Sequence, residues 1–161
     1  MLTFRKALLQ DQDAIWEILQ NIIKKGSSFA YPSNLTKEEM LAYWLAEDKH
    51  AYVALEDDEV IATFFMKDNQ PGRGSHIANA AYAIAEKHAG KGIGQKVGEY
   101  SLIEAKRLGY KAMQFNLVVK SNVRAVSLWK RIGFEIIGEI PDAFFHPQEG
   151  YTNAYVMYRK L

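Results

Sequence analysis

Two stretches near the amino terminus repeat their apolar residues at helical spacing. The first runs from residue 11 to residue 25, and Gly26 ends it. The second follows Thr36, which with Glu39 three residues later has the pattern of a capping box. We therefore predict two consecutive amphipathic helices. Their apolar stripes are Ala14, Ile15, Ile18, Leu19, Ile22 and Ile23 in the first and Met40, Leu41, Trp44 and Leu45 in the second.

Shorter apolar segments bounded by turn residues predict strands. Residues 50–55 and 60–66 have the pattern of a hairpin whose turn is Asp57-Asp58. The other predicted strands are residues 2–6, 76–84, 112–119, 134–138 and 151–158, and further helices are predicted from Gly94 to residue 108 and over residues 122–131. This mixed order favours an α/β or α+β sheet with helices on its faces.

Composition and charge narrow the class of protein. The 161 residues predict a single domain over 1–161, and twenty Lys and Arg against nineteen Asp and Glu argue against a nucleic-acid partner. The chain has no cysteine, which excludes a disulfide scaffold and a thiolate site, and its four histidines lack metal-ligand spacing. We expect no metal. With no long apolar run and no visible secretory signal, we also expect a cytoplasmic protein without a membrane partner.

A glycine-rich segment, Gly90-Lys91-Gly92-Ile93-Gly94-Gln95, follows a predicted strand and opens a predicted helix. Glycines allow a ligand to approach the backbone, and the free N–H groups of a helix start attract phosphate. A tight turn between two packed elements would use the same residues. The spacing matches neither the Walker pattern nor the dinucleotide fingerprint, since Gln95 and Val97 stand where the latter needs its third glycine.

A second motif runs from Asn122 through Ala125 and Leu128 to Gly133-Phe134. Together with the glycine segment, it resembles the GCN5-related N-acetyltransferases (GNAT family) over essentially the whole chain. The resemblance implies a mixed, mostly antiparallel sheet of six to seven strands with about four helices. It also implies that the glycine loop binds the pyrophosphate of acetyl-CoA.

Two residues depart from the family pattern. Ala89 replaces the usual Arg or Gln before the glycines, so one polar anchor is missing. Trp129 replaces the tyrosine that usually protonates the leaving thiolate, and an indole N–H cannot surrender its proton near neutral pH. We expect Trp129 to serve in packing.

The resemblance further implies which residues form the site. Tyr82, Ile84 and Asn122 would join residues 90–95 in binding acetyl-CoA, and a backbone N–H near Ile84 would stabilise the oxyanion. A narrower resemblance, carried by the segments 74–80 and 115–118, is to fungal and bacterial acetyltransferases that act on proline analogues such as azetidine-2-carboxylate.

That narrower resemblance implies catalytic roles for Asn79 and Asn116 on the two central strands, and substrate contacts from Phe29, Tyr31 and His76. The alternative for the asparagines is structural, because an amide among apolar neighbours must be hydrogen-bonded. His76 could act as a base or be an ordinary histidine at a strand end.

These residues predict an enzyme that transfers acetyl from acetyl-CoA to the amine of a small molecule, an amino acid or proline analogue, by direct attack in a ternary complex. Two alternatives remain open. One is acetylation of a protein amino terminus or lysine, and the other is a CoA-binding regulatory module, which the missing tyrosine at Trp129 favours. A homodimer is possible, because dimers are common among the relatives.

Overall fold

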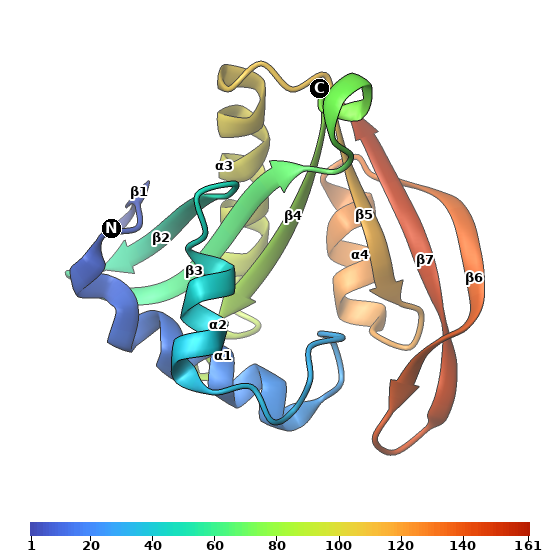
Figure 1. Ribbon diagram of the computed structural model, residues 1–161, viewed down its shortest axis with the longest axis horizontal. Helices are drawn as coiled ribbons and strands as arrows, with labels where there is room; N and C mark the ends of the chain where they lie inside the picture. Colours follow the sequence, from blue (N-terminus) through green and yellow to red (C-terminus); the bar gives the residue numbers. More distant parts are fainter.

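A seven-stranded sheet crosses the computed structural model, which describes residues 1–161, and helices cover both of its faces (Figure 1). The strands are β1 (Leu2–Lys6), β2 (His50–Glu56), β3 (Glu59–Asp68), β4 (Ile77–Ile84), β5 (Ala112–Val119), β6 (Glu135–His146) and β7 (Gly150–Lys160). The α-helices are α1 (Gln12–Lys25), α2 (Lys37–Trp44), α3 (Ile93–Arg107) and α4 (Val123–Arg131). The predicted mixed, mostly antiparallel sheet is confirmed.

The strand order is β1-β2-β3-β4-β5-β7-β6, and every neighbouring pair is antiparallel except β4 and β5, which are parallel. These two central strands pair only at Ile77 with Ala112 and at Ala78 with Met113. Beyond that point they separate along the rest of their length (Figure 1). The sheet therefore opens at its centre, between two strands that both carry predicted site residues.

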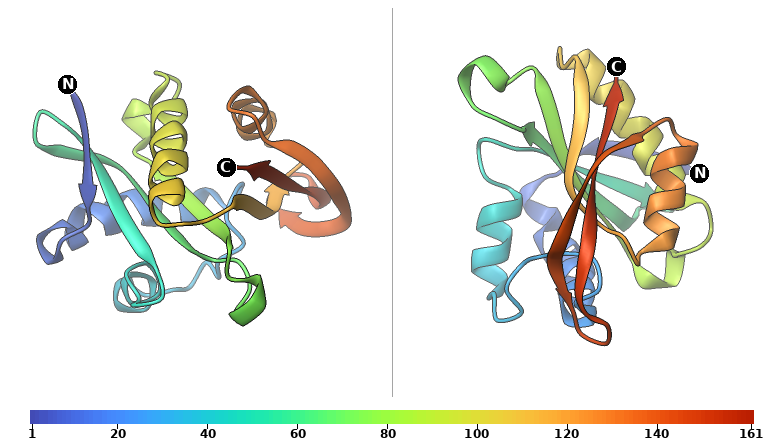
Figure 2. Two further views of the ribbon diagram at one scale, coloured as in Figure 1. Left: turned by 90° about the horizontal axis from the view of Figure 1, so that it is seen from above. Right: turned by 90° about the vertical axis from the view of Figure 1, so that its right-hand side faces the viewer.

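Two helices lie on each face of the sheet, as the view from above shows (Figure 2). On one face, α1 and α2 bury Leu19 and Trp44 against Phe65 of β3 and Ala83 of β4. On the other face, α3 and α4 pack on a second core that contains Val97, Phe64, Met113, Phe115 and Trp129. Alternate residues of β4 and β5 therefore belong to different layers, as the two-residue period of a strand requires.

Local sequence signals explain where α1 ends and where α2 begins. Gly26 takes the left-handed conformation (φ 65°) after α1, a conformation that costs glycine little. The Thr36 hydroxyl accepts the Glu39 N–H at 3.2 Å and so caps α2 as predicted. The Glu39 carboxylate accepts the Thr36 hydroxyl at 2.9 Å and not the Thr36 backbone N–H, so only half of the predicted capping box forms. None of the helices is long and apolar enough to cross a membrane.

Strand β6 departs from the prediction, because it extends to His146 and does not stop at residue 138. Most of its residues are exposed on the sheet edge, so they lack the apolar alternation by which a strand is recognised. Pro141 also argues against a strand in the sequence, because proline cannot donate a ladder hydrogen bond; an edge strand tolerates it. The ladder to β7 shifts register twice along this strand, which adds to the irregular pattern.

Candidate active site

The opening between β4 and β5 contains a cavity of about 290 Å³. Its walls come from these two strands, from the loop that joins α1 to α2, and from α4 together with the residue that precedes it. Six predicted site residues line it: Phe29, Tyr31, Asn79, Tyr82, Asn116 and Asn122. Residues that are distant in sequence therefore share one cavity at the centre of the sheet.

The edge of β4 that faces the cavity carries free backbone groups. The Asn69 N–H bonds the Ile77 carbonyl, and the Ala85 N–H bonds the Ile61 carbonyl, so odd-numbered residues of β4 bond to β3. In an antiparallel ladder the residues between them point the other way. The N–H groups of Ala80, Tyr82 and Ile84 therefore face β5, which no longer pairs with β4 there. They form a row of donors along the opening.

The glycine segment lies at one end of this row, where α3 begins. Gly90 and Gly92 have positive φ angles of 77° and 76°, and Gly92 is the residue before the first turn of α3. No backbone N–H from residues 90–95 donates to an acceptor in the protein. A Cβ on Gly94 would lie 3.2 Å from Ile84 and 3.3 Å from Leu128, so a side chain there would have to displace these neighbours by a few tenths of an ångström. The geometry is that of an anion-binding helix start.

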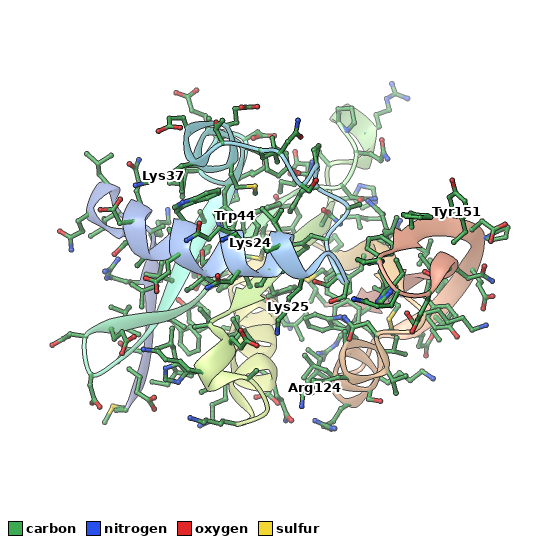
Figure 3. All side chains as sticks on the ribbon, turned by 90° about the horizontal axis from the view of Figure 1, so that it is seen from below. Lys24, Lys25, Lys37, Trp44, Arg124 and Tyr151 are labelled. Atoms are coloured by element: carbon green, nitrogen blue, oxygen red, sulfur yellow. The ribbon has the colours of Figure 1, made fainter.

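Arg124, which the sequence analysis did not single out, lies beside the glycine segment. It is exposed on the first turn of α4, on the side of the molecule seen in Figure 3. A Cβ on Gly90 would be 3.4 Å from its guanidinium nitrogen. Such a cation adds to the attraction for phosphate that the N–H groups already provide. The sequence signal was its place two residues after Asn122, on the helix that follows β5.

Asn79 bridges the two central strands at the closed end of the opening. Its amide nitrogen donates to the backbone carbonyl of Gln114 at 3.0 Å. A carbonyl only accepts, so the nitrogen of the Asn79 amide must face it, and this fixes the amide orientation. The Asn79 oxygen has no hydrogen-bond partner in the protein, and Asn79 lines the cavity. One amide thus joins the strands and presents an acceptor to a ligand.

Asn116 lies on the same face of the sheet as Asn79, but it is exposed. Its amide is engaged on both sides, because it donates to Asn69 at 2.7 Å and accepts from Gln114 at 3.0 Å. The ladder between β5 and β7 shifts register between Phe115 and Val118. Such irregularities redirect side chains. Asn116 therefore stands at a bend of β5, within a chain of surface amides.

Tyr82 and Trp129 form the opposite wall, on the α3 and α4 side. The Tyr82 hydroxyl bonds Ser101 at 2.7 Å and points into the core, and burial raises the pKa of this phenol. The Trp129 ring packs against Tyr82 and Phe115, with ring centroids 4.8 and 4.6 Å apart. Trp129 is 8% exposed, and its indole N–H makes no hydrogen bond in the protein. Both residues supply aromatic surface to the cavity.

A third wall of the cavity comes from the loop between α1 and α2. Phe29 and Tyr31 pack together with ring centroids 5.0 Å apart, and Phe29 also contacts Trp44 of α2. A Cβ on Gly26 would lie 3.1 Å from Pro147, so this loop touches the turn between β6 and β7. The loop is therefore held from two sides. Its two aromatic rings line the cavity.

Besides the glycine segment 90–95, two predicted residues lie outside the cavity. His76 is exposed and lies just before β4, at the end where β4 and β5 still pair. It does not line the cavity, so its predicted contact with the substrate stays a prediction. The Ile84 side chain lines a neighbouring cavity beside α1 and packs near Gly94, and only the backbone of Ile84 faces the opening. The strand pattern could not reveal where β4 and β5 separate, which decides both cases.

Asn122 connects the opening to α4. Its side-chain oxygen accepts the Ala125 N–H at 3.3 Å and so caps this helix. The amide nitrogen of Asn122 makes no hydrogen bond in the protein, and the residue lines the cavity. Asn122 therefore offers a donor to a ligand without giving up its structural bond.

Comparison with known proteins places the chain among acetyltransferases. Residues 16–134 match the model of the acetyltransferase (GNAT) family. A GCN5-related N-acetyltransferase from Kribbella flavida is 36% identical and superimposes with a TM-score of 0.95, covering 99% of this chain and 98% of that one. The structure of yncA from Salmonella typhimurium with its cofactor acetyl-CoA has a TM-score of 0.88 at 21% identity, over 100% of this chain and 94% of that one.

N-acetyltransferase aca1 of Schizosaccharomyces pombe is 39% identical over 98 residues. The match covers 60% of this chain and 47% of that protein. The chain thus spans about half the length of this fungal relative.

Proposed function

The chain belongs to the acetyltransferase (GNAT) family, and we propose that it acetylates the amine of a small molecule in the cavity between β4 and β5. The family predicted from the two motifs is confirmed, and the protein is an acetyltransferase that uses acetyl-CoA. The observation that carries the proposal is the cavity itself. It is small, at about 290 Å³, and is bounded on the acceptor side by a loop that two contacts hold in place.

The glycine segment fits the phosphate end of acetyl-CoA. Free N–H groups of residues 90–95, the start of α3 and the Arg124 guanidinium all favour negative charge at this point. We infer that the pyrophosphate binds here through Gly90, Lys91, Gly92, Ile93, Gly94 and Gln95. The missing polar side chain at Ala89 then matters little, because the backbone supplies most of the donors.

The row of N–H groups along β4 leads from this anion site toward Asn79. An extended thioester arm can lie against this edge as an additional strand would, with Tyr82 and Asn122 beside it. The acetyl-CoA thioester, when bound there, supplies an electrophilic carbonyl carbon. We propose that one of the free N–H groups between Ala80 and Ile84 donates to its oxygen and stabilises the oxyanion.

Asn79 and Asn116 would hold the acceptor amine on the other side of the opening. The free oxygen of Asn79 accepts an N–H of the amine, which leaves the nitrogen lone pair for attack on the thioester. The C–N bond forms, the C–S bond breaks, and the proton lost by the amine goes to the departing thiolate. Because an amide is not a base, Asn79 orients the amine and moves no proton.

An amino-acid acceptor, as in the proline-analogue group that the chain resembles, also needs a partner for its carboxylate. Lys67 of β3 pairs directly with Asn79 in the ladder and therefore projects from the same face of the sheet. This arrangement supports an amino acid or proline analogue as one member of the acceptor class.

Release of the CoA thiol with a panel of acceptors tests the proposal. We expect turnover with small amines, including azetidine-2-carboxylate and alaninamide, and none with peptides that carry a free amino terminus or a lysine. Turnover with peptides alone would favour a protein acetyltransferase. Binding of CoA without turnover of any acceptor would favour the regulatory module.

A further inference from the structure

None of the sixteen residues that line the cavity carries a charge at neutral pH. The polar groups among them are three asparagine amides, a serine, two tyrosine hydroxyls and one indole N–H. Desolvating an ammonium ion in such a site costs several kcal/mol that no carboxylate offsets. A neutral amine keeps its hydrogen bonds, since its N–H can donate to the free oxygen of Asn79.

The titratable side chains of the cavity are not bases near neutral pH. Burial and the adjacent Tyr43 raise the pKa of Tyr31, and burial raises the pKa of Tyr82. Both phenols therefore stay protonated, and the Tyr82 hydroxyl is turned toward Ser101.

The charged or titratable groups on the surrounding elements are either hydrogen-bonded to other residues or positively charged. Asp68, at the end of β3, accepts the Tyr110 hydroxyl at 2.7 Å. His146, at the turn between β6 and β7, accepts the Gln148 and Glu149 N–H groups on Nδ1, so its neutral form carries the proton on Nε2. Lys67 beside Asn79 and Arg124 beside Gly90 are cations and repel an ammonium group.

We propose that the acceptor is a weakly basic amine, which enters the cavity already neutral because this chain supplies no base to deprotonate it there. The inference rests on the proposed function and narrows its substrate class. It ranks arylamines, hydrazines and α-amino amides such as alaninamide above aliphatic amines of the lysine type. Azetidine-2-carboxylate, a secondary alkylamine of similar basicity to lysine, should then be turned over mainly at high pH.

The basicity of an amine sets the fraction of it that is neutral in solution. An α-amine with a pKa of about 8 is about one-fifth neutral at a pH of about 7.4, whereas a lysine-type amine with a pKa of about 10.4 is about one-thousandth neutral. The fraction able to bind thus differs by about 200-fold. No carboxylate lines the cavity to reduce this difference by holding the cation.

Profiles of kcat/KM against pH for three amines of different basicity test the inference. With aniline, which is neutral over the whole range, we expect a flat profile from about pH 6 to about pH 9. With alaninamide the profile should level off near a pH of about 8, and with butylamine it should still rise tenfold per pH unit at about pH 9.

An inflection with aniline between about pH 6 and about pH 8 would reveal a base on the protein and overturn the inference. Turnover of butylamine without turnover of the two weaker bases would also overturn it. Absence of turnover with all three amines, in a protein that binds CoA, would instead refute the proposed function.

A matched pair of variants tests whether the missing negative charge explains the preference for weakly basic amines. One variant adds a carboxylate to the cavity, and the other adds an uncharged amide of the same shape. Ser28 lines the cavity and makes no side-chain hydrogen bond in the protein. Ser28→Asp should raise the ratio of kcat/KM for butylamine to that for alaninamide at least tenfold above the ratio of Ser28→Asn, which has the same shape and no charge. Equal ratios in the two variants would contradict the inference.

Discussion

Replacing Asn79 by alanine separates the two roles that the structure gives to this side chain. The amide nitrogen bonds the Gln114 carbonyl across the opening, and its loss leaves a half-buried carbonyl unpaired. We expect this to cost about 1 kcal/mol of unfolding free energy, or about 2–4 °C in melting temperature for a chain of this length. The amide oxygen is the proposed contact to the amine. Loss of a transition-state hydrogen bond of about 2.7 kcal/mol lowers kcat/KM about 100-fold.

The assay combines differential scanning fluorimetry, steady-state kinetics with a small amine, and calorimetry with CoA on the same preparation of Asn79→Ala. CoA affinity should not change, because the glycine segment lies at the other end of β4. Asn116→Ala is the matched control for stability alone, since it removes an amide from the same face whose hydrogen bonds are exposed. Because Asn116 is also proposed to hold the amine, its kcat/KM should fall as well. Its melting temperature should fall by less than that of Asn79→Ala. A lowered melting point with full activity in Asn79→Ala would refute the catalytic part of the reasoning.

Three further predictions concern the anion site, the aromatic wall and acid stability. Gly92→Asp should weaken CoA binding at least tenfold by calorimetry relative to Gly92→Asn, which tolerates the same positive φ without the charge; equal affinities would misplace the phosphate site. Trp129→Phe should lower kcat less than about tenfold, because the indole N–H is no proton donor for the thiolate; a loss of several orders of magnitude in a folded variant would contradict this. The Arg5 guanidinium lowers the pKa of Asp11, so its stabilisation is present above the usual carboxyl pKa of about 3.9 and is lost as pH falls through the lowered value. Urea unfolding should therefore show wild type losing its advantage over Asp11→Asn below a pH of about 4, and a constant difference between them would argue against the ion pair.

The sequence predicted the order of the elements because the signals that define them are local. Gly26 and Thr36 carry the helix boundaries, and both take the expected conformation or contact. The glycine segment is local in the same sense, since its three glycines open α3. The resemblance likewise assigned Asn79 and Asn116 to the site, and both line the cavity.

The remaining features depend on where strands meet, which no local pattern contains. The separation of β4 from β5 leaves His76 outside the cavity and frees the N–H groups beyond it. The bond from Asn79 to the Gln114 carbonyl spans the two strands, so the sequence could not decide between its structural and its catalytic role. Arg124 approaches Gly90 only through the packing of α4 beside α3.

The most direct test of acetyl transfer to a small amine is mass spectrometry of the products formed from isotopically labelled acetyl-CoA. The protein would be given one mixture of small amines together with peptides that carry a free amino terminus and a lysine. The account predicts label on the small amines, most of all on the weakly basic ones, with one CoA thiol released for each acetyl group transferred. Label on the peptides with none on the small amines would contradict it.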